Sequence, residues 1–199
     1  MSYNPRDHYF KKAKQENFAA RSVFKLEEID RKFKLLKPKQ TVLDLGAAPG
    51  SWSQYAGQKI GPGGRLLGVD LSPISVRVPN AVFLQADLRD LELEKIFVEH
   101  GFVPPFDVVL SDMAPKTTGV RMTDQARSME LCELALDVAR RYLRPGGHFV
   151  CKLFHSDDFN VLRGAIKESF DRFEAVKPDS TRKISKEIFL VGLGRKKQS

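Results

Sequence analysis

Four aspartates at the ends of apolar runs are the most chemically informative residues of this sequence. Asp44, Asp70, Asp87 and Asp112 each close a run of strand length that is rich in Val, Leu or Phe. The carboxyl ends of parallel strands meet at one edge of a sheet, where ligands bind, so we expect these four carboxylates to lie together. A carboxylate accepts hydrogen bonds from hydroxyl and amino groups and attracts cations. One such aspartate can be a helix cap, but four in succession predict a ligand site.

The loop that follows the first aspartate narrows the choice of ligand. Residues 44–52 read Asp-Leu-Gly-Ala-Ala-Pro-Gly-Ser-Trp, between an apolar strand at 41–43 and a helix that can begin at Ser51. The segment lacks the Gly-Lys-Ser/Thr of a phosphate-binding P-loop and the G-x-G-x-x-G of a dinucleotide site, and Asp44 would repel an anion. An acidic G-x-x-x-G loop suits a cationic cofactor with an amino group, and it resembles the first motif of S-adenosylmethionine (SAM)-dependent methyltransferases. The candidate cofactor residues here are Asp44, Gly46, Ala47, Pro49 and Gly50.

The other three aspartates are expected to bind different parts of such a cofactor. Asp70 lies 20 residues after Gly50, the spacing at which an acidic residue binds adenosine ribose hydroxyls. Asp87 can accept a hydrogen bond from the adenine amino group. Asp112 precedes Met-Ala-Pro and is expected nearest the reacting centre. Each residue taken singly could instead be a cap or a surface acid.

Alternating strand and helix patterns predict an α/β fold. We expect a Rossmann-like, seven-stranded, mostly parallel sheet with helices on both faces. The expected strands are 41–43, 65–70, 81–87, 106–112, 148–154, 173–176 and 188–193, and the expected helices are 18–36, 51–55 onward, 90–98, 123–143 and 157–170. Because no repeat or linker interrupts this order, we expect one domain over residues 1–199.

Composition excludes several classes of protein. No apolar run approaches the roughly 20 residues of a membrane span, and the first residues lack the apolar centre of a signal peptide. The two cysteines lie in apolar patterns, which favours buried thiols in a reducing cytoplasm. The four histidines are scattered and form no zinc pattern, so we expect no metal. We expect a cytoplasmic protein with no membrane partner, a monomer with no obligate protein partner.

The N-terminal segment carries most of the positive charge. The net charge is +8, and residues 1–39 hold 11 Lys or Arg against 5 Asp or Glu. This surplus predicts that residues 1–39 meet a polyanionic partner such as RNA, beside a core over 40–195. The alternative on charge alone is a basic, solvated helix that contacts no partner. Arg6, Lys11, Lys12 and Lys14 are expected to meet phosphates. The aromatic side chains among them, Tyr9, Phe10 and Phe18, can stack on bases or can dock the segment on the core.

Taken together, the motifs of this chain resemble the FtsJ family of SAM-dependent ribosomal RNA 2′-O-methyltransferases. The matching segments are 21–26, 44–54, 111–115, 146–152, 177–182 and 185–189, and they span nearly the whole chain. The resemblance implies a catalytic tetrad of Lys25, Asp112, Lys152 and Glu187. It also implies cofactor contacts from Gly50, Trp52, Asp70, Asp87 and Asp112. Ser51 stands where bacterial members usually have Gly, and the loops 73–79 and 116–118 also depart from the family pattern.

The tetrad suits methyl transfer to a hydroxyl. The reaction is an in-line displacement, so positioning supplies much of its rate, and the hydroxyl must lose a proton. Lys152 can act as the base only if its pKa falls from about 10.4 towards about 8. Burial, Lys25 and a sulfonium favour that change, whereas Asp112 and Glu187 oppose it. Lys152 is therefore either a base or a group that orients the hydroxyl. The alternative to a catalytic tetrad is that the four residues form two ion pairs on the surface.

We accordingly expect an enzyme that methylates the ribose 2′-OH of a uridine in large-subunit ribosomal RNA with SAM. The same reaction on transfer RNA is one alternative. A catalytically silent RNA-binding ribosome-assembly factor is another, although it would not need the tetrad. A small-molecule methyltransferase would not need the basic N-terminal segment.

Overall fold

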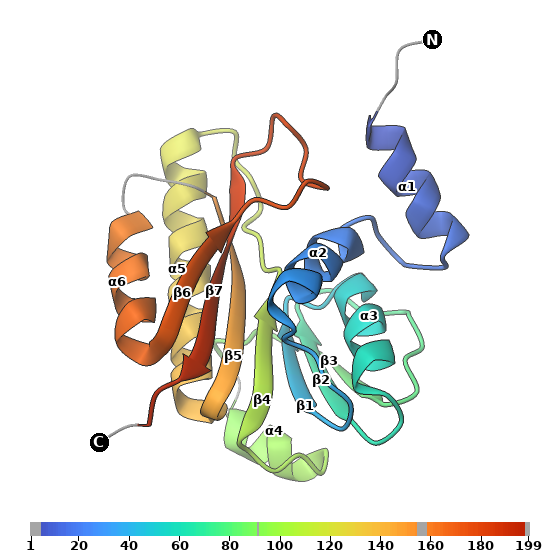
Figure 1. The fold of residues 1–199 in the computed structure, drawn as a ribbon, viewed down its shortest axis with the longest axis vertical. Helices are drawn as coiled ribbons and strands as arrows, with labels where there is room; N and C mark the ends of the chain where they lie inside the picture. The colour runs from blue at the N-terminus through green and yellow to red at the C-terminus, as the bar shows by residue number, and fades with distance from the viewer. Residues whose placement is uncertain (1–4, 91, 155–158, 198–199) are drawn as a thin grey trace.

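A seven-stranded sheet forms the centre of the protein. The structure, a computed structural model, describes residues 5–90, 92–154 and 159–197. The strand order is β3-β2-β1-β4-β5-β7-β6, and β7 runs antiparallel to both of its neighbours while the other pairs are parallel (Figure 1). The strands are β1 (Thr41–Leu45), β2 (Arg65–Asp70), β3 (Ala81–Gln85), β4 (Phe106–Ser111), β5 (Leu143–Phe154), β6 (Phe170–Val176) and β7 (Glu187–Arg195). The predicted mostly parallel sheet is confirmed.

Helices cover both faces of the sheet. They are α1 (Pro5–Gln15), α2 (Val23–Phe33), α3 (Ser51–Ile60), α4 (Leu93–Glu99), α5 (Arg121–Tyr142) and α6 (Phe159–Ser169). α2 and α3 pack on one face, whereas α4, α5 and α6 pack on the other (Figure 1). The fold class predicted from the alternating pattern is confirmed.

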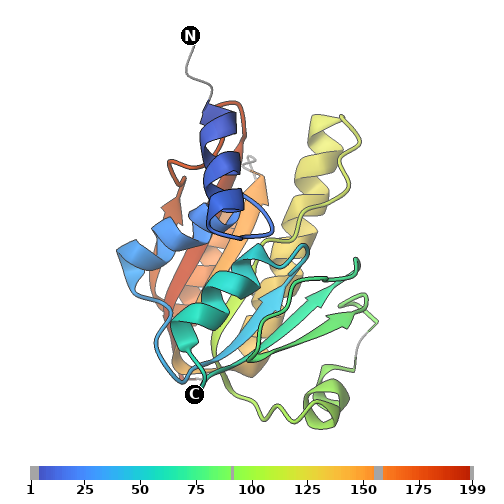
Figure 2. The same cartoon turned by 90° about the vertical axis from the view of Figure 1, so that its right-hand side faces the viewer.

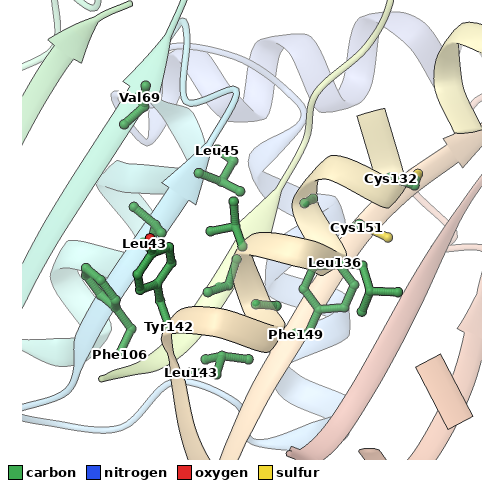
Figure 3. Close-up of a cluster of buried hydrophobic side chains, with 14 of the residues drawn as sticks. Leu43, Leu45, Val69, Phe106, Cys132, Leu136, Tyr142, Leu143, Phe149 and Cys151 are labelled. Carbon is green, nitrogen blue, oxygen red and sulfur yellow. The ribbon is translucent and has the colours of Figure 1, made fainter. Parts of the chain in front are cut away.

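Two hydrophobic clusters, one on each face, hold the layers together. Side chains alternate along a strand, so Val42 of β1 points to the α2–α3 cluster while Leu43 and Leu45 point to the α5 cluster. Figure 3 shows the α5 cluster, with the buried thiols of Cys132 and Cys151 at its margin. Burial on both faces explains why the central strands are continuous apolar runs.

The N-terminal segment contains a helix, α1, that was not among the expected helices. α1 lies beyond the edge formed by the carboxyl ends of the parallel strands, next to α2 (Figures 1 and 2). Tyr9 and Phe18 pack against Phe24, and Lys12 lies 4.4 Å from the centre of the Phe24 ring. Two of the three aromatic side chains therefore dock the segment on the core, whereas Phe10 is 62% exposed.

Several element boundaries differ from the prediction. The apolar pattern over 18–36 contains a helix only at Val23–Phe33, and Lys34 ends it in the left-handed conformation. β5 begins at Leu143, the last residue of the expected helix and five residues before the predicted start of this strand at His148. The helix expected over 157–170 is described from Phe159 onward, and its first two residues lie outside the described residues.

Candidate active site

An acidic cavity of about 370 Å³ lies at the carboxyl ends of the parallel strands. Its wall includes five predicted site residues, which are Gly46, Asp70, Asp87, Asp112 and Lys152. Met113, Leu131 and Arg89, which the sequence reasoning did not select, also line it. The strand-end aspartates thus converge as expected, and three of the four reach the same cavity.

The glycine loop is held by hydrogen bonds and by tight packing. The amides of Gly46 and Ala47 donate to the Val69 carbonyl, at 2.8 and 3.1 Å. Gly46 has a φ of 74°, and a Cβ there would lie 2.6 Å from Cγ of Met113, so a side chain would collide with the cavity wall. This position needs glycine for both its conformation and its space.

Gly50 begins α3 but is covered by the chain rather than open to the cavity. Its φ is 109°, and a Cβ there would lie 2.1 Å from Cγ2 of Val76 in the 73–79 loop. Ala47 is buried, and Pro49 is exposed. Ala47, Pro49 and Gly50 do not line the cavity. Their proposed role in cofactor binding is therefore to shape the loop that carries Gly46.

Asp44 lies fully buried behind this loop. Its Oδ2 accepts a 2.6 Å hydrogen bond from the Ser53 hydroxyl, whereas Oδ1 has no hydrogen-bond partner. Burial raises the pKa of the Asp44 carboxyl from 3.8 to about 7; the Ser53 bond opposes this, and the charges of Asp112 and Asp70 add to it. A buried oxygen without a donor is costly unless something compensates it, and a nearby cation would do so.

Asp70 and Asp87 present carboxylates to the cavity in different ways. Asp70 accepts hydrogen bonds from the amides of Ala48, at 3.0 Å, and Ser72, at 2.7 Å, which fixes its orientation. Asp87 is paired with Arg89, whose guanidinium donates to both carboxylate oxygens. This pairing lowers the pKa of the Asp87 carboxyl to about 2. Both carboxylates thus line the cavity as hydrogen-bond acceptors, and their contacts with a ribose and an adenine stay predictions.

Trp52 lies away from the cavity. Its side chain is 2% exposed, its indole N–H donates to the Ser22 carbonyl at 2.9 Å, and its ring packs on Phe189. These contacts join α3 to α2 and β7. The Trp52 indole is thus enclosed by protein and does not line the cavity. The cofactor contact of Trp52 that the resemblance implied stays a prediction.

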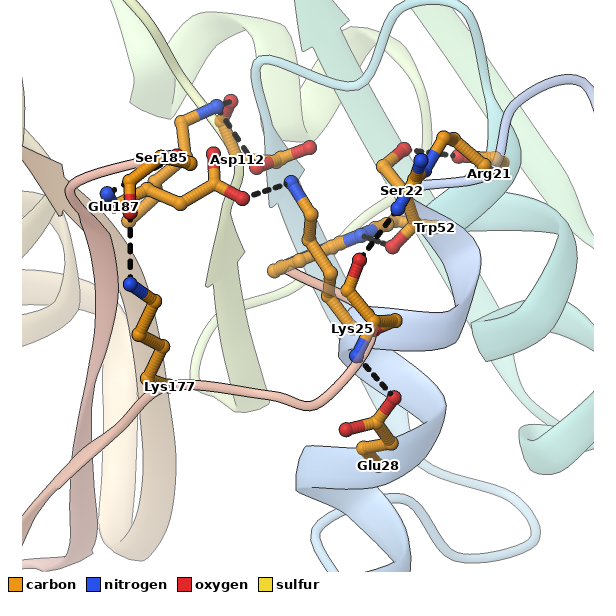
Figure 4. A network of polar contacts seen from close by, with 12 residues as sticks. Arg21, Ser22, Lys25, Glu28, Trp52, Asp112, Lys177, Ser185 and Glu187 are labelled. Carbon is orange, nitrogen blue, oxygen red and sulfur yellow. Dashed lines mark hydrogen bonds and ion pairs between the residues drawn. The ribbon is translucent and has the colours of Figure 1, made fainter. Parts of the chain in front are cut away.

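The four residues of the expected tetrad form two adjoining ion pairs. Nζ of Lys25 lies 2.5 Å from Oε1 of Glu187, and Nζ of Lys152 lies 2.9 Å from Oδ1 of Asp112 (Figure 4). Lys152 also donates to the Asp112 backbone carbonyl at 2.5 Å. The four side chains are only 9–18% exposed, so they are not ordinary surface pairs.

Four separate elements bring these side chains together. Lys25 comes from α2, Asp112 follows β4, Lys152 lies in β5, and Glu187 begins β7. Since β7 is antiparallel, its first residue, rather than its last, lies at the edge where the parallel strands end. Lys152 belongs both to the ion pair and to the cavity wall, so it connects the two parts of the site.

Metal sites and membrane-spanning helices are both absent from the part of the chain that the structure describes. There, no three or more His, Cys, Asp or Glu side chains are grouped as metal ligands. In the same residues, no helix is both long enough and apolar enough to span a membrane.

Comparison with known proteins decides the family. A model of the family described as "FtsJ-like methyltransferase" matches residues 18–195. The chain belongs to the FtsJ-like methyltransferase family. This membership confirms the predicted resemblance, and it agrees with the acidic cavity and the two ion pairs at the strand ends.

Other members of the FtsJ-like family match along their full length. A Bdellovibrio bacteriovorus protein named "Ribosomal RNA large subunit methyltransferase E" is 78% identical over 196 residues, which are 98% of this chain and all of that protein. A protein of the same name from Syntrophobacter fumaroxidans is 54% identical over 199 residues, again covering 99% of this chain and all of that protein.

Solved structures agree on the fold. A crystal structure described as a putative ribosomal RNA methyltransferase from Plasmodium falciparum has a TM-score of 0.75 at 26% identity, covering 91% of this chain and all of that one. Aeropyrum pernix fibrillarin, solved with bound SAM, has a TM-score of 0.58 at 18% identity, covering 80% of this chain and 68% of that one. The second likeness concerns the fold alone.

Proposed function

We propose that this protein transfers a methyl group from SAM to the 2′-OH of a ribose, that of a uridine in large-subunit ribosomal RNA. The observation that carries the proposal is the position of Lys152, which lines the acidic cavity and is bonded to Asp112 at the same time. The full-length 78% identity to a ribosomal RNA large subunit methyltransferase E supports the choice of substrate.

The residues of the cavity wall suit SAM in charge and in hydrogen-bonding capacity. Asp70 and Asp87 would accept hydrogen bonds from the ribose hydroxyls and the adenine amino group. Asp44, with its unpartnered buried Oδ1, and Asp112 would lie near the positive ammonium and sulfonium. Gly46 has no side chain, so the space beside Met113 stays open. SAM supplies an electrophilic methyl group on a positively charged sulfur.

The two ion pairs would then hold the acceptor ribose. A lysine ammonium has three N–H donors, and Lys152 uses two of them on Asp112, so one remains for the 2′ oxygen. Lys25, paired with Glu187, would contribute a second positive charge close by. Fixed positive groups stabilise the negative charge that develops on the oxygen as its proton leaves. This geometry favours the orienting role for Lys152, which stays protonated. The hydroxyl proton would then pass to water as the methyl group is transferred.

RNA binding is proposed for the basic N-terminal segment, residues 1–39. Lys11 and Lys14 are exposed on α1, which lies at the same edge of the sheet as the ion pairs. Lys12 is instead half-buried over Phe24, and the side chain of Arg6 lies outside the described residues. We further propose that the protein acts as a monomer of one domain in the cytoplasm, where ribosomes are.

Methylation of purified ribosomal substrates tests the proposal. Large subunits and free 23S RNA from cells that lack this gene would be incubated with the protein and methyl-labelled SAM, and the modified riboses mapped. We expect label on the 2′ oxygen of one uridine. Lys152→Met should bind SAM and RNA yet transfer the methyl group at least about 100-fold more slowly at saturating RNA.

Three results would contradict parts of this proposal. Label only on transfer RNA would move the substrate to the first alternative. SAM and RNA binding without any transfer would indicate a silent assembly factor. A Lys152 variant that lost RNA affinity but kept its rate at saturation would make Lys152 a phosphate contact.

A further inference from the structure

A side chain outside the expected tetrad links the helix that carries Lys25 to the loop that carries Glu187. The Glu28 carboxylate of α2 accepts hydrogen bonds from two successive amides of the β6–β7 loop. Its Oε2 lies 2.6 Å from the Asp179 nitrogen, and its Oε1 lies 3.0 Å from the Ser180 nitrogen. Figure 4 shows Glu28 on α2 with one of these bonds. We name these two bonds the Glu28 clasp. Both oxygens of one charged group are therefore engaged by backbone 151 and 152 residues away in sequence.

The clasp lies one helical turn from the catalytic ion pair. Residues three apart lie on one face of an α-helix, so Lys25 and Glu28 face the β6–β7 loop together. One turn earlier, Arg21 donates to the Ser180 carbonyl at 2.6 Å. The loop is thus bonded to α2 at its start, through residues 179 and 180, and at its end, through Glu187.

The loop between these anchor points is compact. Ser180 is 1% exposed and Thr181 is 6% exposed, and two tight turns follow, with amide-to-carbonyl bonds of 2.9 Å from Thr181 to Pro178 and from Ser185 to Arg182. The amide of Glu187 donates to the Ser185 hydroxyl at 3.2 Å. Because each step is bonded to the next, fixing residues 179 and 180 limits where Glu187 can lie.

We propose that Glu28 is a positioning residue of the methyl-transfer site, which sets the distance between α2 and the β6–β7 loop so that Glu187 meets Lys25. Charge-assisted hydrogen bonds are short and directional, which suits a carboxylate to this task. The inference rests on the proposed function, since it acts through Lys25 and Glu187. Glu28 itself touches neither ion pair nor cavity wall.

The test compares Glu28→Gln with Glu27→Gln. Glutamine keeps the size of Glu28 but offers a single acceptor oxygen, so its NH₂ group would face one of the two loop amides. Glu27 carries the same charge about 100° further round the helix, so its replacement is a control for charge alone. Amide hydrogen exchange should accelerate at Asp179 and Ser180 in the Glu28 variant and not in the control. SAM affinity should stay unchanged in both.

Single-turnover methyl transfer at saturating RNA then tests positioning. We expect Glu28→Gln to lower the rate about 10- to 100-fold, the cost of a small misplacement of catalytic groups, with the control near wild type. In a Glu187→Gln background, Glu28→Gln should cause little further loss, because the group that it positions is already gone.

Two results would overturn the inference. An unchanged rate despite faster exchange would make the clasp purely structural. An equal loss of rate with and without Glu187 would mean that Glu28 acts by another route. Wild-type activity on ribosomal RNA is measured in the same experiment, so a failure of the proposed function is recognised separately.

Discussion

Asp44 should make the stability of the protein fall as the pH rises. Its carboxyl is fully buried with one oxygen unpartnered, and its pKa is raised from 3.8 to about 7. Below about pH 4 the group is neutral in the folded and unfolded chains alike. Between about pH 4 and pH 7 the unfolded chain loses this proton and the folded chain keeps it, so stability decreases over that window and levels off above it.

The size of this effect follows from the pKa. At about 1.4 kcal/mol for each pH unit, the change from 3.8 to about 7 corresponds to about 4 kcal/mol. Asp44→Asn has no proton to lose, yet it offers a donor and an acceptor as the protonated carboxyl does. The variant should therefore gain about 4 kcal/mol of stability relative to wild type between pH 4 and pH 8.

Guanidinium unfolding of the SAM-free protein at several pH values measures this difference. Asp171→Asn, which removes an exposed carboxylate, is the control and should run parallel to wild type. If the Asp44→Asn and wild-type curves were also parallel, the burial argument would be refuted.

Cofactor binding provides an independent test of the same group. A sulfonium and an ammonium near Asp44 favour its ionised form, so SAM binding near pH 6.5 should release a proton. Calorimetry in buffers of different ionisation enthalpy detects that proton, and Asp44→Asn should abolish it. Binding by wild type without proton release would place the cofactor charges away from Asp44.

Three further predictions follow from the site. Asp70→Ala should weaken SAM binding by about 1.5–3 kcal/mol, about 10- to 150-fold, and unchanged affinity by calorimetry would contradict the ribose contact. Replacing Lys11 and Lys14 by Gln should flatten the slope of log RNA affinity against log salt by about 1.4–1.8, and a full slope would place the RNA elsewhere. Gly61 has a φ of 66° and no atom within 4 Å of an added Cβ, so Gly61→Ala should lower the free energy of unfolding by about 1–2 kcal/mol through backbone strain alone. Gly50→Ala should lower it clearly more, because its Cβ would also collide with Val76. Equal losses in denaturant unfolding would refute the packing argument.

The sheet and the acidic edge were predictable because they depend on local patterns. An apolar run that is buried on both faces is visible in the sequence, and so is an aspartate such as Asp70 that ends it. The shared direction of the parallel strands β1 to β5 then places their carboxyl ends at one edge. Boundaries were less predictable: β5 begins at Leu143 because this residue pairs with Phe106 of β4, and regular pairing resumes only at His148, after an irregularity that the residue types do not reveal.

The contacts that organise the site were not predictable from residue types. Arg89 pairs with Asp87 two positions earlier, a spacing that is visible but not distinctive. Glu28 resembles any helix-surface carboxylate, and its two amide partners lie in a loop far along the chain. Trp52 was assigned to the cofactor by family resemblance, and only the packing of α2 and β7 against it reveals how its indole is enclosed.

The position of β7 in the sheet has a consequence for synthesis of the chain. β7 follows β6 in sequence but lies between β5 and β6, so those two strands have no common neighbour until residues 187–195 have left the ribosome. The same strand delivers Glu187 to Lys25, which was made 162 residues earlier. A nascent chain can therefore form its glycine loop and acidic cavity first, and it can complete its paired lysines only when the last strand inserts. The Lys25–Glu187 pair is therefore the part of the site that synthesis completes last.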